Sequence, residues 1–251
     1  MFKFFKEMID SVREGAAEAK AELAQEAAEK EAADRAANAA AQARMAAIPA
    51  YEQFLVALGA PYKQTYTREL TTAVRDERPA EFLFSLPLPP DEKVAEFQSM
   101  LNRDFGVTDL ATLQTTYAAM LMVEIDPDVP VEDKAALALS IARASYLVCM
   151  GAAVGHVPAL HALSMTVPLV ETAMARFDGW EDYGRQFVTG EKDAPGSNAL
   201  GSGFLKRSVD SLLKEARSPW RVVAWPASPA EREALLASRP RSQAAIEADA
   251  R

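Results

Sequence analysis

The chain has 251 residues, 49% of them hydrophobic, and a formal net charge of -9 at pH 7. A chain of this length can bury a core of ordinary size in one domain. The excess of acidic side chains repels polyphosphate, so nucleic acid is excluded as a general partner. Because Cys149 is the only cysteine, no intrachain disulfide can form, and we expect a cytoplasmic protein.

The chain opens with a short amphipathic segment, residues 1–12. On a helix its large apolar side chains share one face, with Lys3 and Lys6 at the edge of that face. The members of the face are Phe2, Phe5, Ile9 and Val12. We predict that this segment folds back onto the domain, and the alternative is a weak contact with a membrane or a partner.

An Ala-rich stretch follows, from Asp10 to Ala47. It contains Glu, Lys, Arg and Gln but no proline, which is the composition with the highest helix propensity. We therefore predict one long helix, which completes an N-terminal arm of residues 1–47. Large apolar side chains are nearly absent between Leu23 and Met45, so the helix can bury little surface by itself. We interpret it as a solvated spacer or a weak coiled coil.

Proline, glycine and capping residues divide residues 48–238 into the helices of one globular domain. The predicted helices cover about residues 91–103, 108–124, 131–150, 179–189 and 204–216. Another helix follows Pro158 and should be kinked by Pro168, and a short last helix begins after Ser228.

The rest of the domain is predicted as follows. Residues 81–86 and 221–225 are strand candidates, and the Gly-rich stretch 190–203 is a mobile loop. Residues 239–251 are a polar C-terminal tail. The expected fold class is mostly α, a single compact helical domain with at most a small strand element, preceded by the long Ala-rich helix.

Arg143 is the most informative single residue, because the helix predicted around it is otherwise apolar. A buried guanidinium requires an acidic partner. We expect an internal ion pair, with Glu171 or Asp178 as candidate partners. In the alternative, Arg143 and Arg185 hold an anionic small molecule under the loop of residues 190–203.

Four aromatic residues are further binding candidates, namely Trp180, Tyr183, Trp220 and Trp225. Aromatic rings bury large areas and dominate packing, so we interpret the tryptophans as core residues and keep a recognition surface as the alternative.

Metal and nucleophile chemistry find little support in the sequence. His156 and His161 are five residues apart, whereas a spacing of four places two ligands on one helix face. Cys149 lies among apolar residues, where a thiol behaves as a small hydrophobe. We expect no metal, no cofactor and no catalytic residue.

Four fragments occur in order in the second half of the chain. They are LNRDFGVTDLATLQTTYAAML, IARASYLVCMGAAVGHVPALHAL, FDGWEDYGRQFVTG and SPWRVVAWP. Together they resemble the bacterial domain of unknown function 1266 family over about residues 100–226, with the N-terminal arm outside the comparison. The resemblance implies an α-helical domain and no established activity. In the family pattern an acidic and a basic residue precede the helix arginine, whereas this chain reads KAALALSIAR there.

These features lead us to expect a bacterial protein that acts as a non-enzymatic protein-interaction module. Another protein should contact the N-terminal arm or the aromatic end. The alternative is an enzyme or effector domain that binds an anionic small molecule through Arg143 and Arg185.

Overall fold

The computed structural model describes residues 48–66, 91–121, 133–215 and 218–240, together with five single residues between positions 25 and 36. The chain divides into two compact units, residues 1–44 and 45–251. Apart from the five single residues, which are helical, the stretch predicted as a long Ala-rich helix lies outside the described residues. The amphipathic segment 1–12, the strand candidate 81–86 and residues 241–251 of the tail lie outside them as well.

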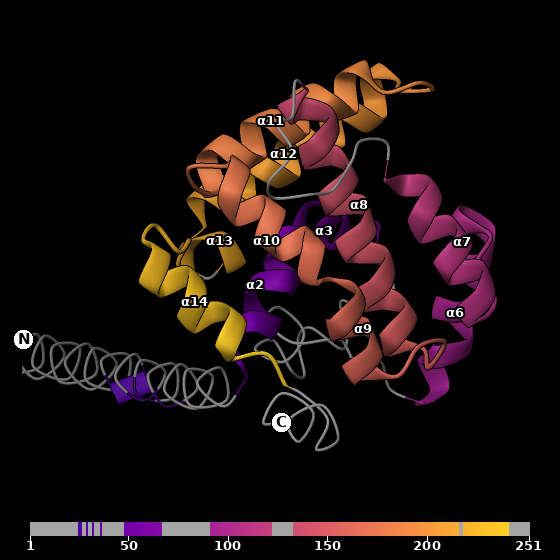
Figure 1. The fold of residues 1–251 in the computed structure, drawn as a ribbon, viewed down its shortest axis with the longest axis horizontal. Coiled ribbons are helices and arrows are strands. Elements are labelled where there is room, and N and C mark those ends of the chain that lie inside the picture. Colours follow the sequence, from indigo (N-terminus) through magenta and orange to yellow (C-terminus); the bar gives the residue numbers. More distant parts are fainter. Residues whose placement is uncertain are drawn as a thin grey trace, which may run out of the picture. The chain divides into compact units, whose positions relative to one another are not determined.

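The described part of the second unit is built from helices and contains no strand, which confirms the prediction of a mostly α, compact helical domain (Figure 1). Its helices are α2 (Ala50–Leu58), α3 (Ala60–Tyr66), α6 (Asp91–Phe105), α7 (Leu110–Met120), α8 (Lys134–Ala153), α9 (Ala159–Met165), α10 (Val167–Arg176), α11 (Trp180–Asp193), α12 (Ala199–Lys214), α13 (Pro219–Val222) and α14 (Pro229–Ala237).

Helix α8 is the centre of the core. Figure 1 shows it between α10 and α3 on one side and α6 and α7 on the other, and it packs against all four and most extensively against α11. It is long and apolar enough to cross a membrane, but 78% of its most apolar stretch is buried inside the protein. Asp133 starts the helix by accepting hydrogen bonds from the backbone N–H groups of Ala135 and Ala136, at 3.0 and 2.9 Å.

The prediction of a mobile loop over residues 190–203 is wrong. Helix α11 continues to Asp193 and α12 begins at Ala199, so only five residues connect the two helices. Asn198 stabilises the start of α12, because its side chain accepts a hydrogen bond from the backbone N–H of Gly201 at 2.9 Å.

Two glycines that suggest helix ends in the sequence are packing positions in the structure. A Cβ at Gly190 would lie 2.2 Å from the carbonyl oxygen of Ala135, so glycine lets α11 approach α8 closely. A Cβ at Gly151 would lie 2.0 Å from Cδ1 of Leu113, and α8 continues past this residue to Ala153. At both positions glycine allows two helices to come into close contact, and it does not terminate either helix.

Several helix ends also differ from the prediction. The helix expected to kink at Pro168 is two helices, α9 and α10, with Pro168 in the first turn of α10 where its missing N–H breaks no hydrogen bond. Helix α7 is capped by Asp109 and ends at Met120, short of residue 124.

The C-terminal strand candidate is wrong, and its residues 223–225 are neither strand nor helix. Residues 221–225 include the end of α13, which Ser218 caps by accepting a hydrogen bond from the N–H of Arg221 at 3.2 Å. The predicted last helix is confirmed as α14, with a capping box formed by Ser228 and Glu231.

Candidate functional site

Arg143, in the middle of α8, connects three helices. Its Nε donates a hydrogen bond to the hydroxyl of Tyr62 on α3 at 2.8 Å, and its Nη2 donates to Oε2 of Glu191 on α11 at 3.1 Å. The Tyr62 hydroxyl donates to the same Glu191 oxygen at 2.8 Å. The predicted internal ion pair is therefore present, but its acid is Glu191 and not Glu171 or Asp178.

The Tyr62–Arg143–Glu191 cluster is largely withdrawn from water. The side chains of Arg143 and Glu191 are 29% and 13% exposed, and Tyr62 is 3% exposed. Burial raises the pKa of Tyr62, so its hydroxyl stays protonated and can donate to Glu191. Burial by itself lowers the pKa of Arg143, but Tyr62 and Glu191 outweigh burial and raise it. The arrangement is a compensated ion pair that joins α3, α8 and α11.

Arg185 does not take part in this cluster. Its side chain is 66% exposed and donates a hydrogen bond to Asp182, in the preceding turn of α11, at 3.1 Å. The residues predicted as a loop over Arg143 lie largely in α11 and α12, so the expected arrangement of both arginines under a loop is not present.

The other four candidates lie together in an aromatic cluster that includes Phe54 of α2. Trp180 stacks on Trp220 with ring centroids 5.5 Å apart, and meets Trp225 edge-on at 4.7 Å. Trp180, Tyr183 and Trp220 are 7%, 0% and 4% exposed, and Trp225 is half-buried. Their placement supports the interpretation of these residues as core.

Two of the buried indoles use their polar atoms inside the protein. Nε1 of Trp180 donates to the carbonyl of Val223 at 2.7 Å, and Nε1 of Trp220 donates to the carbonyl of Ala57 at 2.8 Å. The second bond adds a donor to a carbonyl in the last turn of α2 that also accepts from the backbone N–H of Gly59. Nε1 of Trp225 is buried and has no hydrogen-bond partner in the part of the chain that the structure describes.

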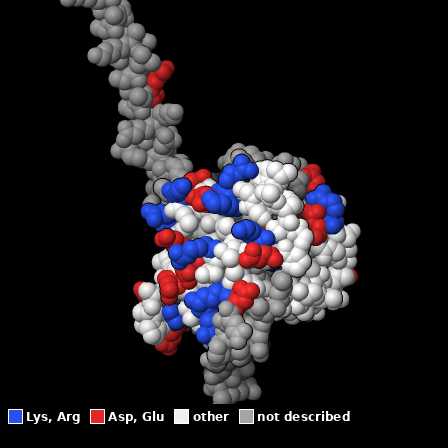
Figure 2. Space-filling model, turned by 90° about the horizontal axis from the view of Figure 1, so that it is seen from above, with Lys and Arg blue, Asp and Glu red and all other residues white. Residues whose placement is uncertain are grey.

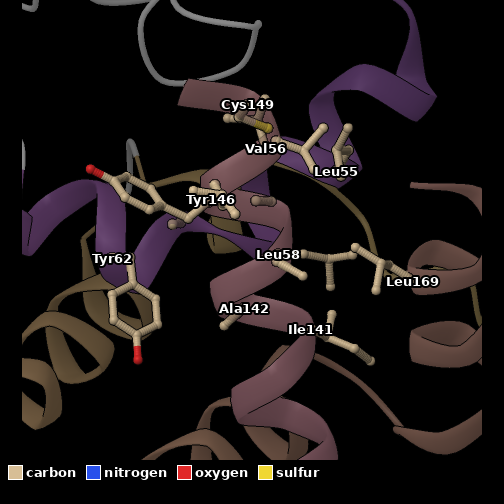
Figure 3. Close-up of a cluster of buried hydrophobic side chains, with 14 of the residues drawn as sticks. Leu55, Val56, Leu58, Tyr62, Ile141, Ala142, Tyr146, Cys149 and Leu169 are labelled. Carbon is tan, nitrogen blue, oxygen red and sulfur yellow. The ribbon is translucent and has the colours of Figure 1, made fainter. Parts of the chain in front are cut away.

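Another buried polar set consists of Cys149 on α8, Lys63 on α3 and the neighbouring Glu52 on α2. Cys149 is 5% exposed and Lys63 is 7% exposed. Burial raises the pKa of Cys149 to about 12 and lowers that of Lys63 to about 8. Figure 3 shows Cys149 beside Val56 in the apolar contact between α8 and α2. The thiol is protonated at neutral pH, in agreement with its interpretation as a small hydrophobe.

Protonated groups in the core should make the fold sensitive to alkali. Burial raises the pKa of Cys149 from 9.0, and those of Tyr51 and Tyr117 from 10.0, to about 12. The folded state therefore binds more protons than the unfolded state above about pH 9, so the free energy of unfolding must fall as pH rises to about 12. Lys63 acts in the opposite direction between about pH 8 and 10.5.

We expect the urea midpoint, followed by circular dichroism, to change little up to pH 9 and to fall steeply between about pH 10 and 12. In Cys149→Ala the opposite effect of Lys63 is no longer offset by the thiol, so the midpoint should rise between about pH 9 and 10, where that of the parent stays level. A midpoint that stays constant to pH 11 would contradict the assignment of these groups as protonated in the core.

The described residues were compared with two kinds of site, a metal centre and a basic surface. Among the described residues no group of three or more His, Cys, Asp or Glu side chains is placed to hold a metal ion. On the face drawn in Figure 2, the Lys and Arg side chains of the described residues are interspersed with Asp and Glu. That face offers no continuous basic surface to a polyphosphate backbone.

One protein-family model matches most of the chain. The model of a family described as Protein of unknown function (DUF1266) matches residues 3–225, which include the Tyr62–Arg143–Glu191 cluster and the aromatic cluster. The match begins far ahead of residue 100, so the exclusion of the N-terminal arm from the resemblance was wrong. A search of curated proteins and a search of solved structures gave no match.

Proposed function

We propose that this chain, which belongs to the DUF1266 family of proteins of unknown function, is a non-enzymatic protein-interaction module. The observation that carries the proposal is an exposed apolar face on α12. Leu200 and Phe204 are 77% and 56% exposed and stand one helical turn apart, so their side chains lie on the same face. Exposed apolar side chains that lie next to one another can mark a protein contact.

The hydrogen bonds of Arg143 favour this proposal over binding of an anionic small molecule. A ligand carboxylate or phosphate at Arg143 would have to displace Glu191, which already neutralises the guanidinium, and Tyr62, which holds its Nε. Arg185, the other arginine of that alternative, is bonded to Asp182. Of the two contact surfaces expected from the sequence, the aromatic end is mostly buried, so the proposed contacts are α12 and the N-terminal arm.

Charge substitutions on α12 test the proposal. Leu200→Glu and Phe204→Glu should leave the melting temperature close to that of the parent, because exposed side chains contribute little to stability. Both should abolish recovery of a partner that co-purifies with the parent chain from the cells that produce it, quantified by mass spectrometry. Leu160→Glu is the matched control, since Leu160 is 42% exposed on α9 and should retain the partner. Equal recovery with the parent and all three variants would refute an interaction through α12.

The N-terminal arm is expected to be dispensable for folding. Residues 10–47 carry few large apolar side chains, and apolar burial stabilises by only about 25 cal/mol per Å². Removal of residues 1–44, the first compact unit, should leave a helical protein that unfolds cooperatively near the melting temperature of the parent. Circular dichroism and thermal melting measure this. Loss of cooperative unfolding would show that the arm belongs to the domain.

A further inference from the structure

The exposed face of α12 carries a cation beside its two apolar residues. The guanidinium carbon of Arg207 lies 4.6 Å from the centre of the Phe204 ring, and its Nε donates to the carbonyl of Gly203 at 3.2 Å. In the part of the chain that the structure describes, no carboxylate pairs with Arg207. The adjacent Lys206, by contrast, is paired with Asp210 at 3.0 Å.

Leu200, Phe204 and Arg207 follow one another at positions i, i+4 and i+7 of α12. This is the spacing with which a helix places one face in a groove of another protein. Aromatic residues and arginine also contribute most of the binding energy at protein interfaces. The opposite face of α12, with Leu205 and Leu212, is buried, and the helix packs on α3 and α11. The exposed face is therefore presented on a helix that is already fixed in the fold, which limits the entropy lost on binding.

We propose that α12 inserts Leu200 and Phe204 into an apolar groove of a protein partner that places a carboxylate against Arg207. This inference rests on the proposed function and adds the chemistry of the partner. A guanidinium without a carboxylate, next to two exposed apolar side chains, complements an apolar groove with an acidic residue at its edge. The planar donors of arginine suit a carboxylate because they can form two parallel hydrogen bonds with it.

An anionic membrane surface would also attract Arg207, but the rest of the protein opposes that occupant. The formal net charge of -9 repels a negatively charged bilayer, and Asp210 neutralises the neighbouring Lys206. A groove with a single acidic residue needs only one cation beside the apolar pair, and Arg207 lies next to Phe204.

The experiment uses the full-length chain. A photo-crosslinking phenylalanine analogue at position 200 captures the partner in the producing cells, with the same analogue at position 160 as the control. The captured protein is then purified, and its affinity is measured by calorimetry. We expect Arg207→Gln to weaken binding about tenfold and Arg207→Glu to weaken it further. Lys206→Gln, the matched control, should change affinity less than about twofold, because Lys206 already has its acid. Exchange of the partner's acid for lysine should restore binding to Arg207→Glu.

The outcomes separate this inference from the proposed function. If Phe204→Glu loses binding while Arg207→Glu binds like the parent, the carboxylate is refuted and the interaction module stands. If neither variant loses binding, or if position 200 captures no more protein than position 160, both proposals fall. Sedimentation of the parent with phosphatidylserine and phosphatidylcholine vesicles, abolished by Phe204→Glu, would assign the face to a membrane and overturn the protein groove.

Discussion

Replacement of Trp220 or Trp180 by alanine should each destabilise the protein by about 3 to 5 kcal/mol, the range for removal of a core tryptophan. Both side chains are less than a tenth exposed, and they stack on one another. Trp180→Ala also leaves the carbonyl of Val223 without its indole donor, and Trp220→Ala removes one of two donors to the carbonyl of Ala57, the other being the backbone N–H of Gly59. Lost apolar burial and a lost hydrogen bond act in the same direction.

Urea unfolding followed by circular dichroism measures these losses without relying on tryptophan fluorescence. Phe204→Ala is the matched control, because Phe204 is 56% exposed and its removal should change the free energy of unfolding by less than about 0.5 kcal/mol. Since the two indoles are in contact, the double variant should lose less than the sum of the single losses. A Trp220→Ala protein that unfolds like the parent would show that the ring is not part of the core.

Arg143→Met should lower stability by about 2 to 3 kcal/mol, less than a completely buried pair because the arginine is 29% exposed. The substitution preserves an apolar side chain of similar length but leaves the carboxylate of Glu191, itself 13% exposed, without its cation. It also removes the donor that holds the Tyr62 hydroxyl between α3 and α8. Thermal melting and urea unfolding at pH 7 measure the loss, and Arg185→Met is the control, since its exposed pair with Asp182 should contribute less than about 1 kcal/mol.

The helices of the second half could be predicted wherever a local signal sets their ends. The capping box of Ser228 and Glu231 involves residues three apart, and it starts α14 as the sequence indicates. Pro168 also marks a real boundary, although the chain responds with two helices instead of one kinked helix.

The structural role of glycine could not be predicted from local signals, because it depends here on residues far away in the sequence. Gly190 lies inside α11, where the carbonyl of Ala135 on another helix leaves no room for a Cβ. A sequence shows only that glycine is flexible and common in turns, so the stretch around it was predicted as a loop. The distinction between a turn and a close helix contact requires the neighbouring helix.

The sequence predicted that Arg143 has an acidic partner inside the protein, but it did not predict which residues form the cluster. An arginine in an apolar helix requires an acid, and the sequence sufficed for that conclusion. The acid is 48 residues away, and the tyrosine that completes the cluster is 81 residues away, so tertiary packing alone selects them. Glu191 was further hidden by the incorrect loop, which placed it in irregular chain.

The exposed face of α12 was not predicted, because of the same incorrect loop. With residues 190–203 treated as a loop, the spacing of Leu200 and Phe204 had no meaning. Asn198 is a strong N-cap residue, and a helix started from it places Leu200, Phe204 and Arg207 on one face. That capping signal was available in the sequence and would have revealed the pattern.

The central claim, that Arg143 is a structural bridge and not a ligand site, is tested most directly by a double-mutant cycle. Unfolding free energies are measured for the parent, Arg143→Met, Glu191→Met and the double variant. We expect each single variant to be destabilised, the double variant to recover part of the loss, and a coupling energy of about 1 to 3 kcal/mol. The contradictory result would be an Arg143→Met protein as stable as the parent, with phosphate or citrate raising the melting temperature of the parent alone.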